Sequence, residues 1–208
     1  GHFTYNGKAY PMGQHGFARD TEFEQIAAGE DFVTYRLCAD EESKKKYPFD
    51  FVLEITHRLE NNRLSVEWNV KNVDDKEMYF TIGGHPAFNV NILPDTDFED
   101  YSLVFKEGIE TLSYILIDAE NGTALTDKTY KLELTNSKYA LKKDMFDKDA
   151  LIFDNGQIEW VGLALPNGKP YIALESKGFP NFGIWSKPGA SYVCLEPWCG
   201  RCDNRGFE

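Results

Sequence analysis

Hydrophobic and polar residues alternate along most of this chain, with the period of two that is typical of β-strands. The clearest case is residues 49–70, where apolar side chains occupy every second position on both sides of Asn61-Asn62. This pattern predicts two antiparallel strands joined by a tight turn, with the apolar side chains of both strands on one face. Residues 3–10 are arranged in the same way around Asn6-Gly7, so a second hairpin is expected there.

Further strands are expected where short apolar or alternating segments lie between turn signals such as Asn121-Gly122 and Asn167-Gly168. These segments are residues 32–38, 78–82, 101–105, 113–117, 128–134, 151–153, 159–165, 171–175, 182–185 and 192–195. Residues 40–46 are expected to form a charged loop, and residues 138–147 a short helix. Many short antiparallel strands predict an all-β fold, a large antiparallel β-sandwich of two packed sheets. Since no linker or repeat divides the chain, residues 1–208 are expected to form a single domain.

Charge and composition narrow the classes of partner. The 34 acidic and 22 basic residues give a net charge of −12, which disfavours nucleic acid and anionic membrane surfaces as partners. No stretch approaches the roughly 18 consecutive apolar residues of a membrane span. Aromatic residues make up 14% of the chain, and such residues favour strands and also stack on sugar rings. Composition therefore predicts a β-rich core, and leaves carbohydrate binding and the oligomeric state open.

The cysteines give a weak metal signal. Cys194, Cys199 and Cys202 have a C-x4-C-x2-C spacing that occurs in zinc and iron–sulfur sites, and a fourth ligand would have to be Cys38 or a histidine. Free cysteines in a reducing cytosol are the default expectation, so we expect a cytoplasmic protein with no metal and no cofactor. No signal peptide is visible, and the chain begins inside a predicted strand without an initiator Met. We therefore expect a fragment of a longer protein.

Three segments interrupt the alternation with small residues, prolines and ionisable groups. In Gly83-Gly84-His85-Pro86-Ala87-Phe88-Asn89, the proline restricts the backbone of His85 to extended conformations, and the two glycines leave room for a backbone or a ligand. Phe88 supplies a flat apolar surface nearby. A histidine held in this way is suited to proton transfer near pH 7. The alternative is a histidine at a strand end that is satisfied by a backbone carbonyl.

Glu196 lies in the second such segment, Leu195-Glu196-Pro197-Trp198. Pro197 holds Glu196 extended, and Trp198 can exclude water from its carboxylate. Desolvation raises the pKa of a carboxylate and makes it a better base. The alternative is that Glu196 is one of many solvated glutamates in an acidic chain.

The third segment contains His15 and Arg19 in a glycine-containing loop. His15 could donate to a hydroxyl group, and Arg19 could bind a polar or anionic group or pair with a carboxylate. His57 is different, because it falls in register with the apolar residues of its strand. We expect His57 to be a buried core histidine with its polar atoms satisfied.

The three segments resemble, together and in this order, the motifs of the aldose 1-epimerase (galactose mutarotase) family. They are His15-Gly16-Phe17-Ala18-Arg19, His85-Pro86-Ala87-Phe88-Asn89 and Glu196-Pro197-Trp198. The chain is most similar to the LacX-like branch and is also similar to the hexose-6-phosphate epimerases. The resemblance covers essentially all 208 residues, and members of the family are usually longer at both ends. It implies a galactose-mutarotase-like supersandwich whose ligand is an aldohexose.

The resemblance also implies roles for individual residues. His85 would be the general acid and Glu196 the general base, while His15 and Arg19 would contact sugar hydroxyls. Phe88 and Trp198 would lie against the sugar. The family has a sugar-binding aspartate between the second and third motifs, and Asp149 is the best match, with Asp154 as the fallback.

Three functions follow from these expectations. The first is a mutarotase that interconverts the anomers of a free hexose. The second is a hexose-6-phosphate 1-epimerase with the same acid and base, which Arg19 disfavours because it is the one cation within a motif. The third is a non-catalytic carbohydrate-binding protein. The sequence does not identify the sugar, because discrimination among hexoses depends on geometry.

Overall fold

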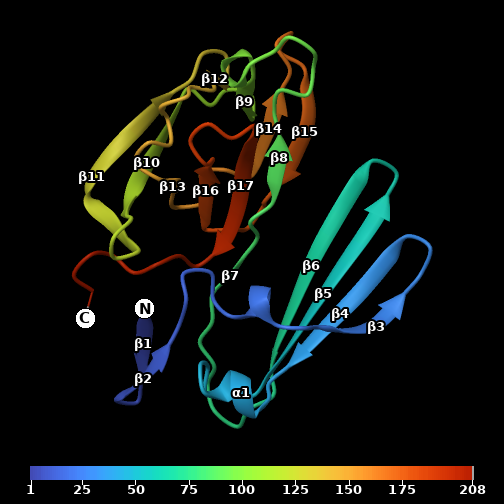
Figure 1. The fold of residues 1–208 in the computed structure, drawn as a ribbon, viewed down its shortest axis with the longest axis vertical. Coiled ribbons are helices and arrows are strands. Elements are labelled where there is room, and N and C mark those ends of the chain that lie inside the picture. Colours follow the sequence, from blue (N-terminus) through green and yellow to red (C-terminus); the bar gives the residue numbers. More distant parts are fainter. Residues whose placement is uncertain (208) are drawn as a thin grey trace. The chain divides into compact units, whose positions relative to one another are not determined.

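The structure, a computed structural model, describes residues 1–207 and confirms an all-β protein built from antiparallel strands (Figure 1). The chain divides into two compact units, Gly1–Tyr79 and Phe80–Glu208, which are taken in turn below. The expectation of one domain over residues 1–208 stays a prediction.

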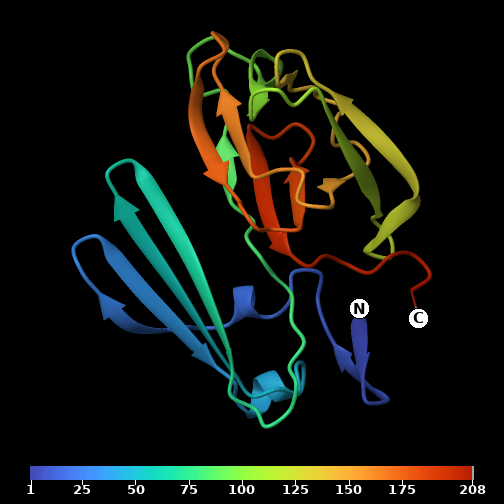
Figure 2. The same ribbon diagram turned by 180° about the vertical axis from the view of Figure 1, so that it is seen from behind.

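The first unit consists of a hairpin and a four-stranded antiparallel sheet (Figure 2). The hairpin joins β1 (His2–Tyr5) and β2 (Lys8–Pro11), and the positive φ angles of Asn6 and Gly7, 50° and 75°, are those of the predicted tight turn. The sheet has the order β3-β4-β5-β6. Its strands are β3 (Glu24–Ala28), β4 (Phe32–Cys38), β5 (Phe51–Glu60) and β6 (Arg63–Asn72). The long β5–β6 hairpin confirms the strongest prediction of the alternation.

The apolar face of this sheet is buried at one end only. Phe51 and Leu53 are at most 7% exposed, whereas Leu59 and Leu64, which are paired across β5 and β6, are more than half exposed. His57 is half-buried, and its Nδ1 has no hydrogen-bond partner among the described residues. The prediction of a fully satisfied core histidine is therefore wrong. The reason is that its neighbours on this face are apolar or aromatic.

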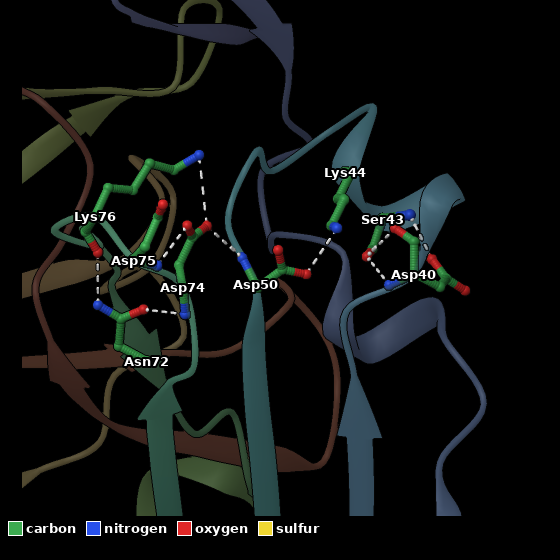
Figure 3. A network of polar contacts seen from close by, with 8 residues as sticks. All are labelled: Asp40, Ser43, Lys44, Asp50, Asn72, Asp74, Asp75 and Lys76. Carbon is green, nitrogen blue, oxygen red and sulfur yellow. Dashed lines mark hydrogen bonds and ion pairs between the residues drawn. The ribbon is translucent and has the colours of Figure 1, made fainter.

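The expected charged loop at residues 40–46 contains a one-turn helix, α1 (Glu41–Lys44). Asp40 caps it, since its carboxylate accepts from the backbone N–H of Ser43 at 2.7 Å while the Ser43 hydroxyl accepts from the backbone N–H of Asp40 (Figure 3). Lys44 then pairs with Asp50 at 2.7 Å, at the start of β5. The helix was missed because its signal is this local capping box rather than an apolar stripe.

The Asp74 side chain connects the segment that precedes β5 with the segment that follows β6 (Figure 3). Its carboxylate accepts from the backbone N–H of Asp50 at 2.8 Å and from that of Asp75 at 2.9 Å, and it pairs with Lys76 at 3.4 Å. The Asn72 side chain closes the turn by accepting from the Asp74 backbone N–H and donating to the Lys76 carbonyl. The contacts of the Asp74 carboxylate, led by the hydrogen bond from the Asp50 N–H, lower its pKa to about 2.

The second unit is a sandwich of a seven-stranded and a four-stranded sheet. The larger sheet has the order β11-β10-β13-β16-β17-β7, and β8 also pairs with β17. Its strands are β7 (Ile82–Gly83), β8 (Ala87–Asn89), β10 (Thr111–Asp118), β11 (Thr123–Glu133), β13 (Leu151–Phe153), β16 (Asn181–Trp185) and β17 (Tyr192–Cys199). The smaller sheet has the order β12-β9-β14-β15, with β9 (Ser102–Phe105), β12 (Lys138–Ala140), β14 (Trp160–Ala164) and β15 (Pro170–Glu175).

One hydrophobic core fills the space between these two sheets. Leu103 and Leu163 of the smaller sheet and Phe153, Ile184 and Leu195 of the larger one all belong to it, and each is at most 1% exposed. Full burial of such a side chain stabilises the fold by about 1.5–3 kcal/mol. The core therefore fixes which face of β17 points inward, and Cys194, Glu196 and Trp198 lie on the other face.

Two of the predicted elements are wrong or shorter than expected. Residues 138–147 are not a helix, because β12 pairs with β9 and the rest of the segment forms turns. Leu141 and Phe146 anchor these turns in the core, at 1% and 3% exposure. The strand expected at 78–82 is reduced to Ile82–Gly83, where it pairs with β17. The short strands β3 and β8 and the 3-10 turns Ala18–Asp20 and Phe98–Asp100 carried no clear sequence signal.

Candidate active site

Strand β17 presents ionisable side chains on the face that points away from the core. Val193 and Leu195 are 0% exposed members of the core, so the alternation of the strand directs Cys194, Glu196 and Trp198 to the opposite face. On the neighbouring strands, Gly183 lies opposite Glu196, and Ala87 and Trp185 lie on the two sides of Cys194. The alternation of the sequence thus places a carboxylate in the middle of a sheet.

Glu196 is a buried carboxylate, with only 4% of its surface exposed. Burial raises its pKa to about 7, because removal from water disfavours the charged form. A hydrogen bond from the Trp198 side chain acts in the opposite direction, and the negative charge of Asp149 adds to the increase. The desolvation expected from the sequence is therefore present, and it makes Glu196 able to exchange a proton near neutral pH.

His85 lies in the segment between β7 and β8 and faces Glu196. Its Nδ1 is 3.3 Å from Oε1 of Glu196, and 40% of its side chain is exposed. Two backbone hydrogen bonds hold the segment against β17: the N–H of Gly84 donates to the Pro197 carbonyl, and the Pro86 carbonyl accepts from the N–H of Leu195. His85 and Glu196 therefore form a fixed acid–base pair that solvent reaches from the histidine side.

Aromatic side chains flank this pair. The ring of Trp185 meets His85 edge-on, with centroids 6.2 Å apart. The indole of Trp198 covers Gly83 and Gly183, since a Cβ at either position would lie within 2.5 Å of it. The room that the sequence predicted at Gly83 is thus filled by Trp198. The glycines are needed because the indole lies flat against both neighbouring strands.

The two aspartates considered for sugar binding have different surroundings. Asp154 already has hydrogen-bond partners. Both of its carboxylate oxygens accept from the Arg201 guanidinium at 2.9 Å, and one also accepts from Asn181. Asp149 itself has a positive φ of 71°, and its carboxylate accepts from the N–H of Ala150 at 2.7 Å. It is also the aspartate whose charge acts on Glu196. Which of the two aspartates contacts a sugar stays a prediction.

Phe88 is placed apart from the pair. It lies in β8 opposite Val193, a core-facing residue, and packs against the core between the sheets. Its predicted contact with a sugar stays a prediction, and its observed contacts are those of a core residue.

His15 and Arg19 lie in the first unit and contact each other. The Arg19 guanidinium is 2.9 Å from Nδ1 of His15, and it also pairs with Asp20 at 3.3 Å. Both side chains are exposed. They lie in a loop whose turn includes Gly16, which has a positive φ. The segment that contains His15 and Arg19 therefore forms one local polar cluster.

The four cysteines are free thiols. Among the described residues, the C-x4-C-x2-C spacing does not gather a metal-binding group, since Cys199 is exposed and only Cys194 lies in a cluster of candidate ligands, together with His85 and Glu196. Cys194 and Trp185 are neighbours of the pair that the sequence did not predict. The signal for Cys194 was its position two residues before Glu196, which places both on one face of a strand. No helix among the described residues is long and apolar enough to cross a membrane.

Comparisons with known proteins identify the family and agree with the fold. Residues 2–202 match the family model described as aldose 1-epimerase. Protein LacX of Lactococcus lactis subsp. lactis is 32% identical over 190 residues, which are 90% of this chain and 63% of LacX. The crystal structure of a galactose mutarotase related enzyme from Lactobacillus acidophilus superposes with a TM-score of 0.91 at 33% identity, over 100% of this chain and 69% of that one. A galactose mutarotase-like protein from Lactobacillus casei gives a TM-score of 0.84 at 32% identity, over 99% and 70% of the two chains.

Proposed function

Because the chain belongs to the aldose 1-epimerase family, we propose that it interconverts the α and β anomers of a free aldohexose by acid–base catalysis. The observation that carries the proposal is the 3.3 Å approach of His85 Nδ1 to the buried carboxylate of Glu196. The chain spans 63% of the length of the LacX proteins that it matches, so the proposal concerns the chemistry for which these residues are equipped.

The reaction needs two proton transfers at neighbouring atoms. Glu196 removes the proton of the C1 hydroxyl, and the imidazolium of His85 delivers a proton to the ring oxygen. The bond between C1 and the ring oxygen breaks, and the open-chain aldehyde rotates about the C1–C2 bond. Closure on the other face returns a proton from Glu196 to the carbonyl oxygen and one from the ring hydroxyl to His85, so both groups regain their starting states.

The geometry suits these roles because the two reacting oxygens are bonded to the same carbon. An acid and a base that act on them have to converge, and His85 and Glu196 do so. A pKa of about 7 for Glu196 lets it accept and release a proton at neutral pH. Each group would contribute on the order of 10²–10⁴-fold to the rate, and the reaction requires no cofactor.

Other residues would hold the sugar. We assign Asp149 to a sugar hydroxyl, since its charge acts on Glu196 and its backbone turn is fixed. Trp198 supplies a flat apolar surface next to the pair. The contacts of His15 and Arg19 with sugar hydroxyls stay a prediction of the sequence. A free sugar fits a protein of net charge −12 better than a phosphorylated one does.

The test is anomer exchange measured by NMR. Purified protein is mixed in turn with glucose, galactose and glucose 6-phosphate, and the exchange rate is compared with that of buffer alone. Wild type is expected to accelerate exchange of a free hexose, and Glu196→Gln and His85→Asn are each expected to lower the rate at least tenfold with an unchanged melting profile. Glu107→Gln, at an exposed position in the same unit, is the matched control. Acceleration with the 6-phosphate alone would replace the free hexose by its phosphate, and sugar binding without any exchange would leave a carbohydrate-binding protein.

A further inference from the structure

Three different metal-binding side chains meet at the acid–base pair. A ring nitrogen of His85, Sγ of Cys194 and a carboxylate oxygen of Glu196 all lie within 4.8 Å of one another. Imidazole, thiolate and carboxylate are together the ligands that Zn²⁺ takes in proteins. The thiol has no part in the proposed proton transfers, so its presence at this point calls for a separate account.

The spacing of the three atoms fits a tetrahedral ion. Bonds of about 2.0–2.2 Å from Zn²⁺ to nitrogen and oxygen place two neighbouring ligands roughly 3.3–3.5 Å apart. The observed separation of His85 Nδ1 and Glu196 Oε1 is 3.3 Å. With a zinc–sulfur bond of about 2.3 Å the thiol should lie roughly 3.6 Å from each of the other two atoms, so a shift of about 1 Å brings Cys194 into place.

The surroundings supply both access and support. Cys194 and Glu196 are 2% and 4% exposed, whereas 40% of the His85 side chain is exposed, so an ion would enter from the histidine side. The Trp198 side chain hydrogen-bonds the Glu196 carboxylate, and Trp185 contacts the His85 ring, so two of the three ligands are oriented by neighbours. Three protein ligands with one open side is the arrangement of an accessible zinc site rather than a closed structural one.

We propose that His85, Cys194 and Glu196 bind Zn²⁺, and that this ion inhibits the protein by occupying the atoms that would transfer protons. Binding of the ion stands on geometry alone, whereas inhibition rests on the proposed function. The ion would take the lone pairs of both the acid and the base, and a sugar would then compete with it. The thiol proton is released to water as the metal–sulfur bond forms.

Metal binding is tested by spectroscopy, which needs no enzymatic activity. Co²⁺ is added to the chelator-treated protein, and a thiolate-to-cobalt absorption band is expected that Zn²⁺ removes by displacement. Cys194→Ala is expected to abolish the band and to weaken Zn²⁺ binding at least tenfold in calorimetry. Cys199→Ala and Cys38→Ala, which change exposed thiols outside the cluster, are the matched controls and should keep both. A band that survives Cys194→Ala, or no Zn²⁺ binding by wild type, would overturn the proposal.

Inhibition is tested in the anomer-exchange assay. Zn²⁺ is expected to slow wild type, a chelator to restore it, and Cys194→Ala to keep its basal rate while needing at least tenfold more Zn²⁺ for half inhibition. Equal sensitivity of the two proteins would refute inhibition through this site. If no protein accelerates exchange, the proposed function fails while the cobalt spectra still decide metal binding. If Cys194→Ala does not fold, Glu196→Gln, which retains the shape of the side chain, must weaken Co²⁺ binding at least tenfold.

Discussion

The indole of Trp198 occupies the volume into which a side chain at Gly183 would project. A Cβ at Gly183 would lie 2.4 Å from Cζ2 of Trp198, closer than carbon atoms approach in folded proteins. Gly183 is also the residue opposite Glu196 in the sheet. The position of the indole, and with it the hydrogen bond from Trp198 to the carboxylate, therefore depends on the absence of a side chain on the neighbouring strand.

We expect Gly183→Ala to displace Trp198 and lower the rate of anomer exchange at least tenfold. Overpacking of this kind costs about 1–3 kcal/mol of stability, so the melting temperature is expected to fall as well. Turnover is measured by NMR and the indole environment by tryptophan fluorescence. Gly13→Ala is the matched control, since a Cβ there meets only the Gly16 carbonyl at an ordinary 3.7 Å. Full activity with an unchanged emission spectrum would contradict the dependence on Gly183.

The pKa of Glu196 predicts the acid limb of the pH profile. With a pKa of about 7, the carboxylate is increasingly protonated below neutral pH and loses its capacity as a base. We expect kcat/KM to fall about tenfold for each pH unit below that value, after subtraction of the buffer-catalysed rate. The profile is measured with a chelator present. An acid limb near the ordinary carboxylate value of 4.5 would show that Glu196 is not the titrating base.

The same pKa predicts how the contribution of Glu196 to the stability of the folded protein changes with pH. Its value is higher in the folded protein than the ordinary 4.5, so folding favours the protonated form. The favourable contribution is complete below pH 4.5 and is lost as the pH rises toward about 7, with a total of roughly 3 kcal/mol. Glu196→Gln is therefore expected to gain stability over wild type between pH 4.5 and 8. Urea denaturation of both proteins at the two pH values measures the gain, and Glu107→Gln, at an exposed position, should show none.

Asp74, in the first unit, is expected to change the stability with pH in the opposite direction. Its pKa is lowered to about 2 by the backbone N–H of Asp50 and its neighbours, so its contribution is present above the ordinary value of 3.8 and lost as the pH falls toward 2. Asp74→Asn is expected to destabilise the protein at neutral pH and to flatten its loss of stability in acid. Thermal melts followed by circular dichroism at pH 7, 4 and 2.5 provide the measurement. Glu60→Gln, at an exposed position in the same unit, should leave the wild-type acid dependence unchanged.

Most strands, and the direction in which their side chains point, could be predicted from the linear pattern of residues. Alternation with a period of two gave the β5–β6 hairpin and the core-facing residues of β17, because the pleat of a strand leaves no other arrangement. It also identified His85 and Glu196 through their prolines, and set Trp198 two residues beyond the carboxylate. In each of these cases the neighbouring residues in the sequence were sufficient for the prediction.

The residues that lie beside the pair could not be predicted in this way, because they depend on the tertiary structure. That Phe88 packs into the core, that Asp154 is engaged by Arg201, and that Cys194 joins His85 are all consequences of strand pairing between distant segments. The failed helix at 138–147 has the same origin, since the pairing of β12 with β9 outweighs local spacing. Pairing of distant strands is set by the packing of the whole core, and a linear pattern carries the period of a strand but not the identity of its neighbour.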